Sequence, residues 1–321
     1  MRVLRKRERP AFTLIEILVV IALIAVLMAL GAGAWFRVKA SQMEKATNTT
    51  LGVLQSQFDQ QWKAESDQAK QDLNDTTKFV GAARTLADND SIRTKVVWTK
   101  LRQKVAFPQN FWEVLVWAPA ASTKYGVAQN SAYRGALAGI SQANVIDPNT
   151  ATAAQYEQLH MESAALLYLA LTQPRRGQGS GFNPVDHVGA HAVGDVTLYG
   201  RHFKVFIDSW QRPIAFIRWP FSAAAMDLNG PPFATLWGAP PAVVDPTDPE
   251  RRLLLGWNTQ LQTSFSQDLG HPLASPPVNL TPVIFSGGRD RDYGVDIIYT
   301  RLGAVEDDNI YGYRSRSAGG K

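Results

Sequence analysis

The chain has 321 residues, of which 45% are hydrophobic and 19% charged, a composition that fits a folded protein and excludes a wholly disordered one. It contains no cysteine, which excludes a disulfide framework, a thiol nucleophile and a thiolate metal site. The net charge is +5, but residues 1–11 hold five Arg or Lys against one Glu. The rest of the chain is therefore nearly neutral, and the charge gives little indication of nucleic-acid binding.

The N-terminal region predicts a membrane-spanning helix. Residues 17–36 carry no charge, and a helix of that length reaches about 30 Å, the thickness of one hydrocarbon core. The basic residues before it favour an N-terminus that stays in the cytoplasm. The run is too long for a cleaved secretory signal, and its small residue, Ala11, precedes the apolar core instead of following it.

The residues from Ala11 to Glu16 read Ala-Phe-Thr-Leu-Ile-Glu after a short basic leader. This pattern resembles the class III signal of type IV pilins and type II secretion pseudopilins. The resemblance implies that prepilin peptidase cuts between Ala11 and Phe12 and that the new N-terminus, Phe12, is methylated. The sequence departs from that family at Ala11, where Gly is nearly always found.

Glu16 has a role that can be argued from its charge. A carboxylate near the mouth of an apolar span is costly unless a cation meets it. Cleavage before Phe12 creates an ammonium group, and a neighbouring subunit shifted along a helix bundle can bring its own ammonium to Glu16. Such a pair would also fix the axial register of the bundle. The alternative is a plain signal anchor of an unrelated enzyme, with Glu16 among the lipid headgroups.

The helix is predicted to continue past the membrane, from about Phe12 to about Lys70. Apolar residues recur along one stripe of its second half, which predicts the face that packs against a globular head: Leu51, Leu54, Phe58 and Trp62. The alternative for this stripe is packing between subunits. Residues 72–91 are polar and predict a connector.

A second helix is predicted from Ile92 to Ala106, with Val97, Leu101 and Val105 on its apolar side. Its other side is basic and is interpreted as a solvated face, with a nucleic-acid patch as the alternative: Arg93, Lys95, Lys100, Arg102 and Lys104. A third helix is predicted from Ala154 to Thr172, with N-cap candidates in residues 149–152.

Strand signals begin after a loop at residues 173–181. Val196–Ile207 and Pro213–Trp219 are rich in β-branched and aromatic residues and predict a hairpin around a turn at 208–212. Proline is concentrated in residues 229–282, which predicts surface loop. Val283–Ser286 and Val295–Thr300 are the last predicted strands.

Together these elements predict an α+β fold with a long N-terminal transmembrane helix as a spine, packed against a globular head with an antiparallel β-sheet, as in pilin-like proteins. The predicted divisions are the leader (1–11), the transmembrane helix (12–37), its periplasmic continuation (38–71), a helical connector and insertion (72–195), and the sheet-containing part with the C-terminal loop (196–321).

Two C-terminal features extend the resemblance. Asp208-Ser-Trp-Gln-Arg-Pro213 is similar to the Asp-Pro-Trp-Gly-x-Pro turn of major pseudopilins, in which the Asp side chain can cap the turn. It departs from that pattern at Ser209 and Gln211, and a generic β-turn is the alternative.

The second feature begins at Ser286-Gly-Gly-Arg-Asp290. It is similar to a loop that, in major pseudopilins, holds calcium together with a later Asp-Ile pair. Calcium takes six to eight oxygen ligands, which carboxylates and exposed carbonyls supply. The candidate carboxylates are Asp290, Asp292, Asp307 and Asp308. The spacing is longer than in that family, Arg291 stands where a Gly is usual, and an acidic surface loop is the alternative.

His187 and His191 are spaced like a metal-binding pair, but such a pair needs a helix. Gly189 and Gly194 argue against a helix here, so no metal is expected. No phosphate-binding glycine loop, nucleophile elbow or Ser-His-Asp order stands out, and we do not expect an enzyme.

The sequence therefore predicts a structural subunit of a pilus-like filament, most similar to a type II secretion pseudopilin. The expected partners are other pilin-like subunits, prepilin peptidase and an inner-membrane assembly platform. The chain would sit in the inner membrane as a single-pass protein with its head in the periplasm. The alternatives are a type IV minor pilin of a pilus or DNA-uptake system, and a membrane-anchored periplasmic binding protein or enzyme.

Overall fold

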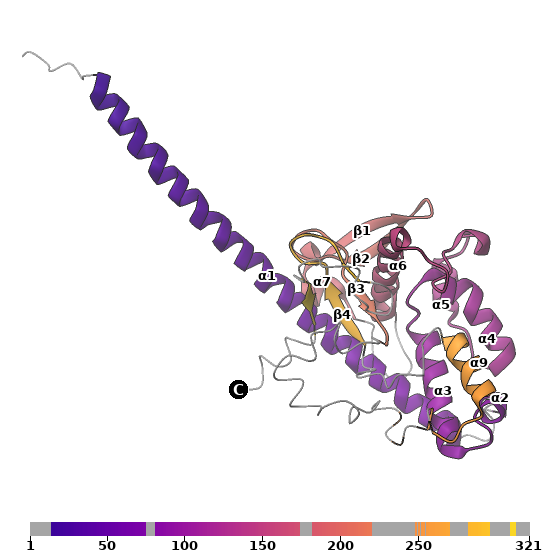
Figure 1. The fold of residues 1–321 in the computed structure, drawn as a ribbon. Helices are drawn as coiled ribbons and strands as arrows, with labels where there is room; N and C mark the ends of the chain where they lie inside the picture. Colours follow the sequence, from indigo (N-terminus) through magenta and orange to yellow (C-terminus); the bar gives the residue numbers. More distant parts are fainter. Residues whose placement is uncertain are drawn as a thin grey trace, which may run out of the picture. The chain divides into compact units, whose positions relative to one another are not determined.

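The computed structural model describes residues 14–74, 81–173, 182–219, 248, 250, 252–253, 255–269, 282–295 and 309–312. The chain divides into two compact units, Met1–Lys45 and Ala46–Lys321. Figure 1 shows the elements of both.

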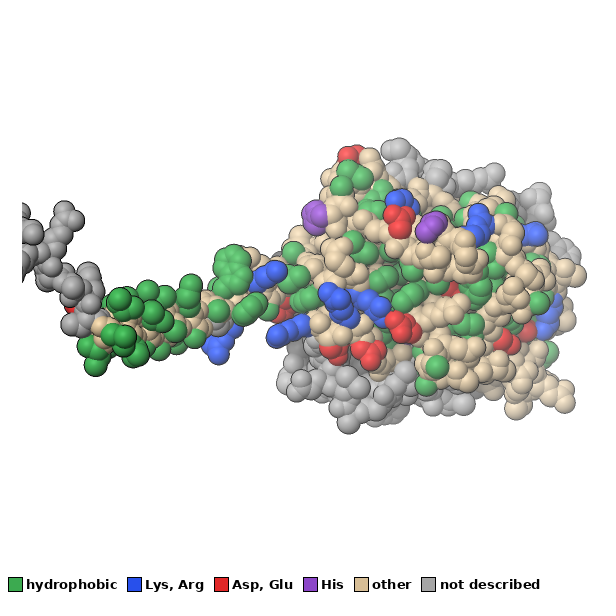
Figure 2. Space-filling view, turned by 90° about the horizontal axis from the view of Figure 1, so that it is seen from above, with side chains coloured by type: hydrophobic (Ala, Val, Ile, Leu, Met, Phe, Trp, Pro, Cys, Tyr) green, Lys and Arg blue, Asp and Glu red, His purple; other side chains and the backbone are tan. Residues whose placement is uncertain are grey.

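The first unit contains the N-terminal part of helix α1, which begins at Leu14 and ends at Asn74. Large apolar side chains from Leu14 to Val38 are 49–83% exposed. Hydrophobic side chains cover much of this part of the helix on the face that Figure 2 shows. Within the described residues, α1 is the one helix long and apolar enough to cross a membrane. Its apolar surface therefore needs an apolar surrounding that this single chain does not supply.

The second unit, the head, contains the rest of α1 and most of the described elements. Its helices are α2 (Gly81–Leu86), α3 (Ser91–Ala106), η1 (Glu113–Trp117), α4 (Ala118–Tyr125), α5 (Ser131–Ala136), η2 (Gln142–Asn144), α6 (Ala153–Thr172), α7 (Pro184–Val188), η3 (Ala190–Ala192) and α9 (Thr259–Leu269). Its strands are β1 (Val193–Leu198), β2 (Arg201–Phe206), β3 (Ala215–Ile217), β4 (Val283–Ser286) and β5 (Ile310–Tyr311).

The strands form two small antiparallel sheets. β1 pairs with β2, with Val193 opposite Phe206, while β4 lies between β3 and β5, with Phe285 opposite both Ala215 and Tyr311. Helix α6 packs against β1, β2 and β3, and Ser163 of α6 bonds the backbone of Phe216 in β3. The predicted α+β fold with a long apolar helix and an antiparallel sheet is thus confirmed.

The core of the head is built on the predicted stripe of α1. Leu51, Leu54 and Phe58 are fully buried, and Trp62 is 8% exposed. The Phe58 ring lies 4.8 Å from that of Phe107 and 5.2 Å from that of Phe216, measured between centroids. Fully burying side chains of this size contributes about 1.5–3 kcal/mol each, so this face holds the second half of α1 within the head.

The predicted hairpin was wrong in its pairing. Val196–Ile207 is not one strand, because it reverses at Tyr199 and Gly200, whose φ angles are 51° and 73°. Two left-handed residues in succession are what a tight two-residue hairpin turn requires. β3 then pairs with β4, and only an isolated bridge between Ile207 and Pro213 joins the two predicted strands.

The basic side of α3 was wrongly interpreted as solvated. Lys95 is exposed, but Arg93, Lys100 and Lys104 are only 3%, 1% and 2% exposed. Arg93 donates to the carbonyl oxygens of Ala87, Arg252, Leu255 and Gly256, so it fixes the segment before α9. A cation on a helix can be buried where backbone carbonyls replace water around it, as they do at Arg93 and Lys104.

Other predictions differ at their limits. The third helix and the strand Val283–Ser286 are confirmed, while α1 extends to Asn74 and α2 lies inside the predicted connector. Helix α9 lies within the proline-rich region that was expected to be loop. The loop at 174–181 and most of Val295–Thr300 lie outside the described residues.

Candidate functional site

The N-terminal site lies in the first turn of α1. Glu16 is exposed there and is the acidic residue of that turn, ahead of the apolar run. Ala11 and Phe12, the predicted cleavage pair, lie outside the described residues. Because the apolar side chains around Glu16 are exposed on this single chain, a bundle of neighbouring helices would cover both them and the carboxylate.

The second site centres on Asp208, at the turn that resembles the pseudopilin pattern. Its Oδ1 accepts the N–H groups of Trp210 and Arg212, each at 2.8 Å, so the predicted cap is confirmed. Its Oδ2 accepts the Ser286 hydroxyl at 2.5 Å. Burial raises the pKa of Asp208, although the Ser286 hydroxyl and the backbone N–H groups oppose that shift. The two sequence features that resemble a pseudopilin are thus joined by one hydrogen bond.

The loop after Ser286 is fixed to the head at three further points. The Tyr293 hydroxyl donates to the Pro213 carbonyl at 2.5 Å, Asn309 donates to the Tyr293 carbonyl at 2.7 Å, and the His160 ring bonds the Val295 carbonyl at 2.8 Å. Arg291 has a φ of 66°, a left-handed conformation that suits the glycine usual at this place. The sequence did not indicate the roles of His160 and Asn309. The partner of His160 lies 135 residues later in the chain, and Asn309 bonds a carbonyl in an irregular loop.

Two of the four predicted calcium ligands lie on this loop. Asp290 and Asp292 are exposed, and one carboxylate oxygen of each accepts an N–H two residues ahead, from Asp292 and Gly294. Asp307 and Asp308 lie outside the described residues, and the described part alone brings no three acidic or His side chains together as a metal group. Within the described residues the buried amide oxygen of Asn309 accepts no hydrogen bond, while its amide nitrogen donates to the Tyr293 carbonyl of this loop.

The two histidines of the pattern around residues 187–195 lie in different helical elements. His187 lies in the last turn of α7 and stacks on the Phe182 ring, with 4.7 Å between ring centroids, whereas His191 lies in η3. Gly189 between them has a φ of 83° and ends the helix. The i, i+4 helical spacing that a metal pair requires is therefore not formed here.

A buried charge cluster lies deep in the head. Arg218 makes two bonds of 2.7 Å to the Glu113 carboxylate, and Lys104 lies 3.3 Å from it. Lys104 also donates to the carbonyls of Asp268 and Leu269 at the end of α9. Burial lowers the pKa of Lys104 to about 8. Burial alone would raise the pKa of Glu113, but Arg218 and Lys104 lower it to about 2.

Glu162 of α6 is a second buried acid, and it has a different environment. Its carboxylate accepts the Tyr199 hydroxyl at 2.6 Å and the Phe111 N–H at 2.8 Å, which ties α6 to the β1–β2 turn and to the chain after α3. Burial raises its pKa to about 7, and these two hydrogen bonds only partly oppose the shift.

This raised pKa predicts a pH-dependent stability. The folded state keeps a proton on Glu162 that the unfolded state releases, so the free energy of unfolding should fall between about pH 4.5 and pH 7, by on the order of 3 kcal/mol. Urea denaturation of the full chain in detergent, followed by tryptophan fluorescence at pH 5 and pH 8, measures this. Glu162→Gln should remove most of the difference in unfolding free energy between pH 5 and pH 8. Glu157→Gln, at an exposed position on the same helix, should leave that difference unchanged. An unchanged profile in Glu162→Gln would contradict the assignment.

The N-terminal region is similar to a known family model. Residues 6–32 match the prokaryotic N-terminal methylation motif. This stretch includes Ala11, Phe12 and Glu16 and much of the exposed apolar run of α1. No curated protein and no solved structure matches the chain.

The chain therefore carries the class III signal of type IV pilin-like proteins, followed by a helix suited to anchor it in a membrane. That signal implies processing by prepilin peptidase and assembly with other pilin-like subunits.

Proposed function

We propose that this chain is a structural subunit of a pilus-like filament of the type II secretion kind, a pseudopilin, with no catalytic role. The observation that carries the proposal is the methylation motif joined to a helix whose apolar side chains are exposed over its first half. The hydrogen bond from Ser286 to Asp208 supports the pseudopilin assignment, because it connects both C-terminal features that resemble that family.

In this proposal the precursor is anchored in the inner membrane, with its head in the periplasm. After cleavage, the apolar helices leave lipid for a bundle in which each covers its neighbours. The Phe12 ammonium of one subunit meets the Glu16 carboxylate of the next, which relieves the cost of two charges in an apolar setting. When the same contact is repeated along one axis, the subunits form an open assembly and not a closed ring, so the product is a filament.

Mass spectrometry of the mature N-terminus tests the function most directly. We expect protein isolated from native membranes to begin at Phe12 and to carry one added methyl group, because residues 6–32 match the methylation motif. A substitution of Phe12 by a charged residue at the cut site should leave the leader attached. Recovery of the intact basic leader on the native protein would refute the proposal.

We also propose that calcium binds the C-terminal loop through Asp290, Asp292, Asp307 and Asp308. The ion would hold the loop closed and take no part in chemistry. The buried amide oxygen of Asn309 and the two exposed carboxylates on one turn support the fit.

Removal of calcium should lower the melting temperature of the full chain in detergent by about 5–10 °C, since a ligand that binds only the folded state stabilises it. Thermal denaturation with and without EGTA measures the shift. Asp290→Asn should lose the response to EGTA, while Asp195→Asn, at an exposed position of β1, should keep it. If EGTA has no effect on the unchanged protein, the metal assignment fails.

A further inference from the structure

Two exposed cations follow the apolar part of α1. Residues 17–36 carry no charge, and Arg37 and Lys39 are the first charged residues after them. Both of these side chains are exposed, and the aromatic residues before them, Trp35 and Phe36, are 68% and 69% exposed. We call Arg37 and Lys39 the basic collar. Figure 2 shows Lys and Arg side chains on two sides of the helix where its apolar part ends.

The position of the basic collar along the helix corresponds to a membrane surface. Residues 17–36 reach about 30 Å, which matches one hydrocarbon core, and the headgroup layer adds about 5–7 Å on each side. Along the helix axis, Arg37 lies about 1.5 Å and Lys39 about 4.5 Å beyond Phe36. Both cations therefore fall within the headgroup layer when the helix spans a membrane. An aromatic side chain such as Trp35 is favoured at the same depth.

The two cations lie on nearly opposite sides of the helix. Successive residues of an α-helix are about 100° apart, so Arg37 and Lys39 are separated by about 200° around the axis. A single neighbouring helix covers one side of α1 and can meet one of these charges. Lipid headgroups surround a lone helix completely and can meet both, so this arrangement favours lipid over one acidic protein partner.

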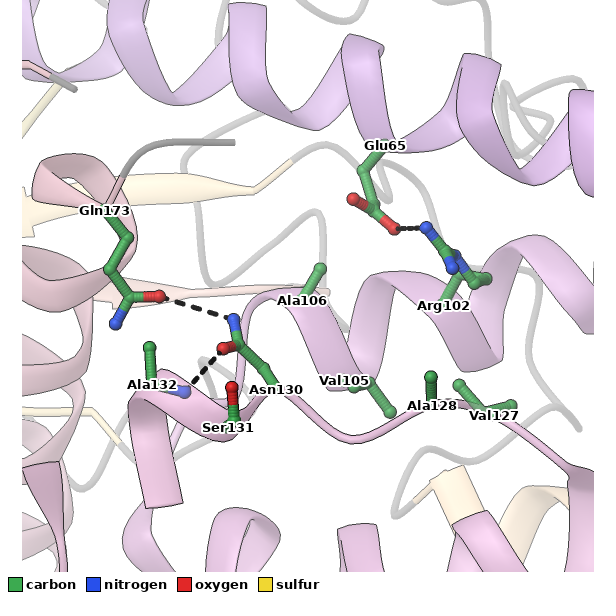
Figure 3. Close-up of a pocket in the computed structure, with 10 residues that line it drawn as sticks. All are labelled: Glu65, Arg102, Val105, Ala106, Val127, Ala128, Asn130, Ser131, Ala132 and Gln173. Carbon is green, nitrogen blue, oxygen red and sulfur yellow. Dashed lines mark hydrogen bonds and ion pairs between the residues drawn. The ribbon is translucent and has the colours of Figure 1, made fainter. Parts of the chain in front are cut away.

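The helix itself places no acid where it could neutralise the basic collar. Side chains on one helix pair when they are three or four residues apart, and the positions at that spacing from Arg37 and Lys39 hold no Asp or Glu. The head half of α1 differs, because Figure 3 shows its Glu65 paired with Arg102, at an N to O distance of 2.5 Å. The charge of the collar is therefore left for an anion from outside the helix.

We propose that the basic collar binds the phosphate groups of anionic phospholipids, such as phosphatidylglycerol, at the membrane surface on the head side of the apolar run. Basic side chains next to a membrane span are attracted to an anionic lipid surface. The Arg37 guanidinium can give two hydrogen bonds to one phosphate, and the Lys39 stem can cover apolar surface while its ammonium reaches the headgroups. The inference rests on the membrane anchoring that belongs to the proposed function.

Processing changes which end of the helix carries basic side chains. Residues 1–11 hold five Arg or Lys against one Glu, so the precursor has cations both before and after its apolar run. In the proposed mature chain the leader is absent, and the basic collar supplies the Lys and Arg side chains that remain next to the span. The collar would then hold the mature subunit at a fixed depth until it enters a filament.

The test uses the full chain in phosphatidylcholine vesicles that contain either spin-labelled phosphatidylglycerol or spin-labelled phosphatidylcholine. Electron paramagnetic resonance measures the fraction of each label that the protein immobilises, and the ratio of the two gives the preference for the anionic lipid. Replacing both collar cations, as Arg37→Gln with Lys39→Gln, should lower this preference at least about fivefold, which is the expected contribution of one cation beside anionic lipid.

A matched control removes the same amount of charge elsewhere. Lys63→Gln with Lys95→Gln changes two exposed cations of the head and should leave the lipid preference unchanged. An unchanged preference in the collar variant would overturn the proposal, and loss of filaments in that variant would then indicate a neighbouring subunit as the partner. Failure of the proposed function gives a different result, because a chain that is not anchored in the membrane immobilises neither label.

Discussion

Replacement of Glu16 by alanine should abolish filament assembly while processing before Phe12 continues. The carboxylate is proposed to meet the ammonium of the adjacent subunit, and removing one partner of a buried ion pair costs about 3–5 kcal/mol. That cost recurs at every subunit contact, so the association constant of each contact should fall by at least about a hundredfold. Cells that express the chain with its assembly machinery would be sheared, and the released filaments quantified against the membrane pool.

Two further variants separate the charge from other effects. Glu16→Gln keeps the shape and removes the charge, so it should fail like Glu16→Ala. Glu44→Gln changes an acid on the same helix beyond the apolar run, and it should assemble normally. Mass spectrometry of each variant must show the cut at Phe12, so that a processing defect is not mistaken for an assembly defect. Normal filaments from Glu16→Ala would exclude the charge pair.

Features that repeat along one element were visible in the sequence. The stripe from Leu51 to Trp62 follows helical spacing, and its burial is confirmed because one face of a helix meets one core. The cap at Asp208 was predictable for a similar reason, since a short Asp side chain readily accepts backbone N–H groups a few residues ahead.

Features that depend on distant partners were not visible. Tyr199 has a left-handed φ without being glycine, so Gly200 was the only glycine that could indicate the turn within Val196–Ile207. The hydroxyl of Tyr199 bonds Glu162, which lies 37 residues earlier, so tertiary contacts support an unfavourable local conformation.

The buried cations of α3 were misjudged because a pattern of charges along a helix does not show what packs against it. Lys104 meets carbonyls of α9, 164 and 165 residues later, and Arg93 meets carbonyls about 160 residues later. The Arg93 charge is tolerated because backbone oxygens replace water, and Lys104 has the Glu113 carboxylate in addition to such oxygens.

The charge cluster gives the largest expected effect on stability. Glu113→Gln should lower the free energy of unfolding of the head by about 3–5 kcal/mol, because it leaves Arg218 and Lys104 buried without a carboxylate. The glutamine keeps the volume, so the loss reports charge more than packing. Urea denaturation of the full chain in detergent, followed by tryptophan fluorescence, suits the measurement. Lys104 Nζ lies 4.4 Å from the centroid of the Trp117 ring, and Arg218 Cζ lies 4.3 Å from that of Trp219.

The pH dependence of this variant gives an independent check. Glu113 has a lowered pKa, so its stabilisation is present above about pH 4.5 and is lost as the pH falls toward 2. Lys104 already has a pKa lowered to about 8, and the loss of the Glu113 charge should lower it further. The cost of Glu113→Gln should therefore be smaller at pH 9 than at pH 6, because a neutral Lys104 no longer needs a counter-charge.

A double-mutant cycle distinguishes this cluster from general damage to the core. Arg218→Met with Glu113→Gln removes both members of the two-bond pair, and the double variant should be more stable than the sum of the single losses predicts, by at least about 1 kcal/mol. Glu157→Gln, at an exposed ion pair with Arg212, should cost under about 1 kcal/mol. Additive losses in the cycle would show that Glu113 and Arg218 act separately, and the cluster would then contribute only through packing.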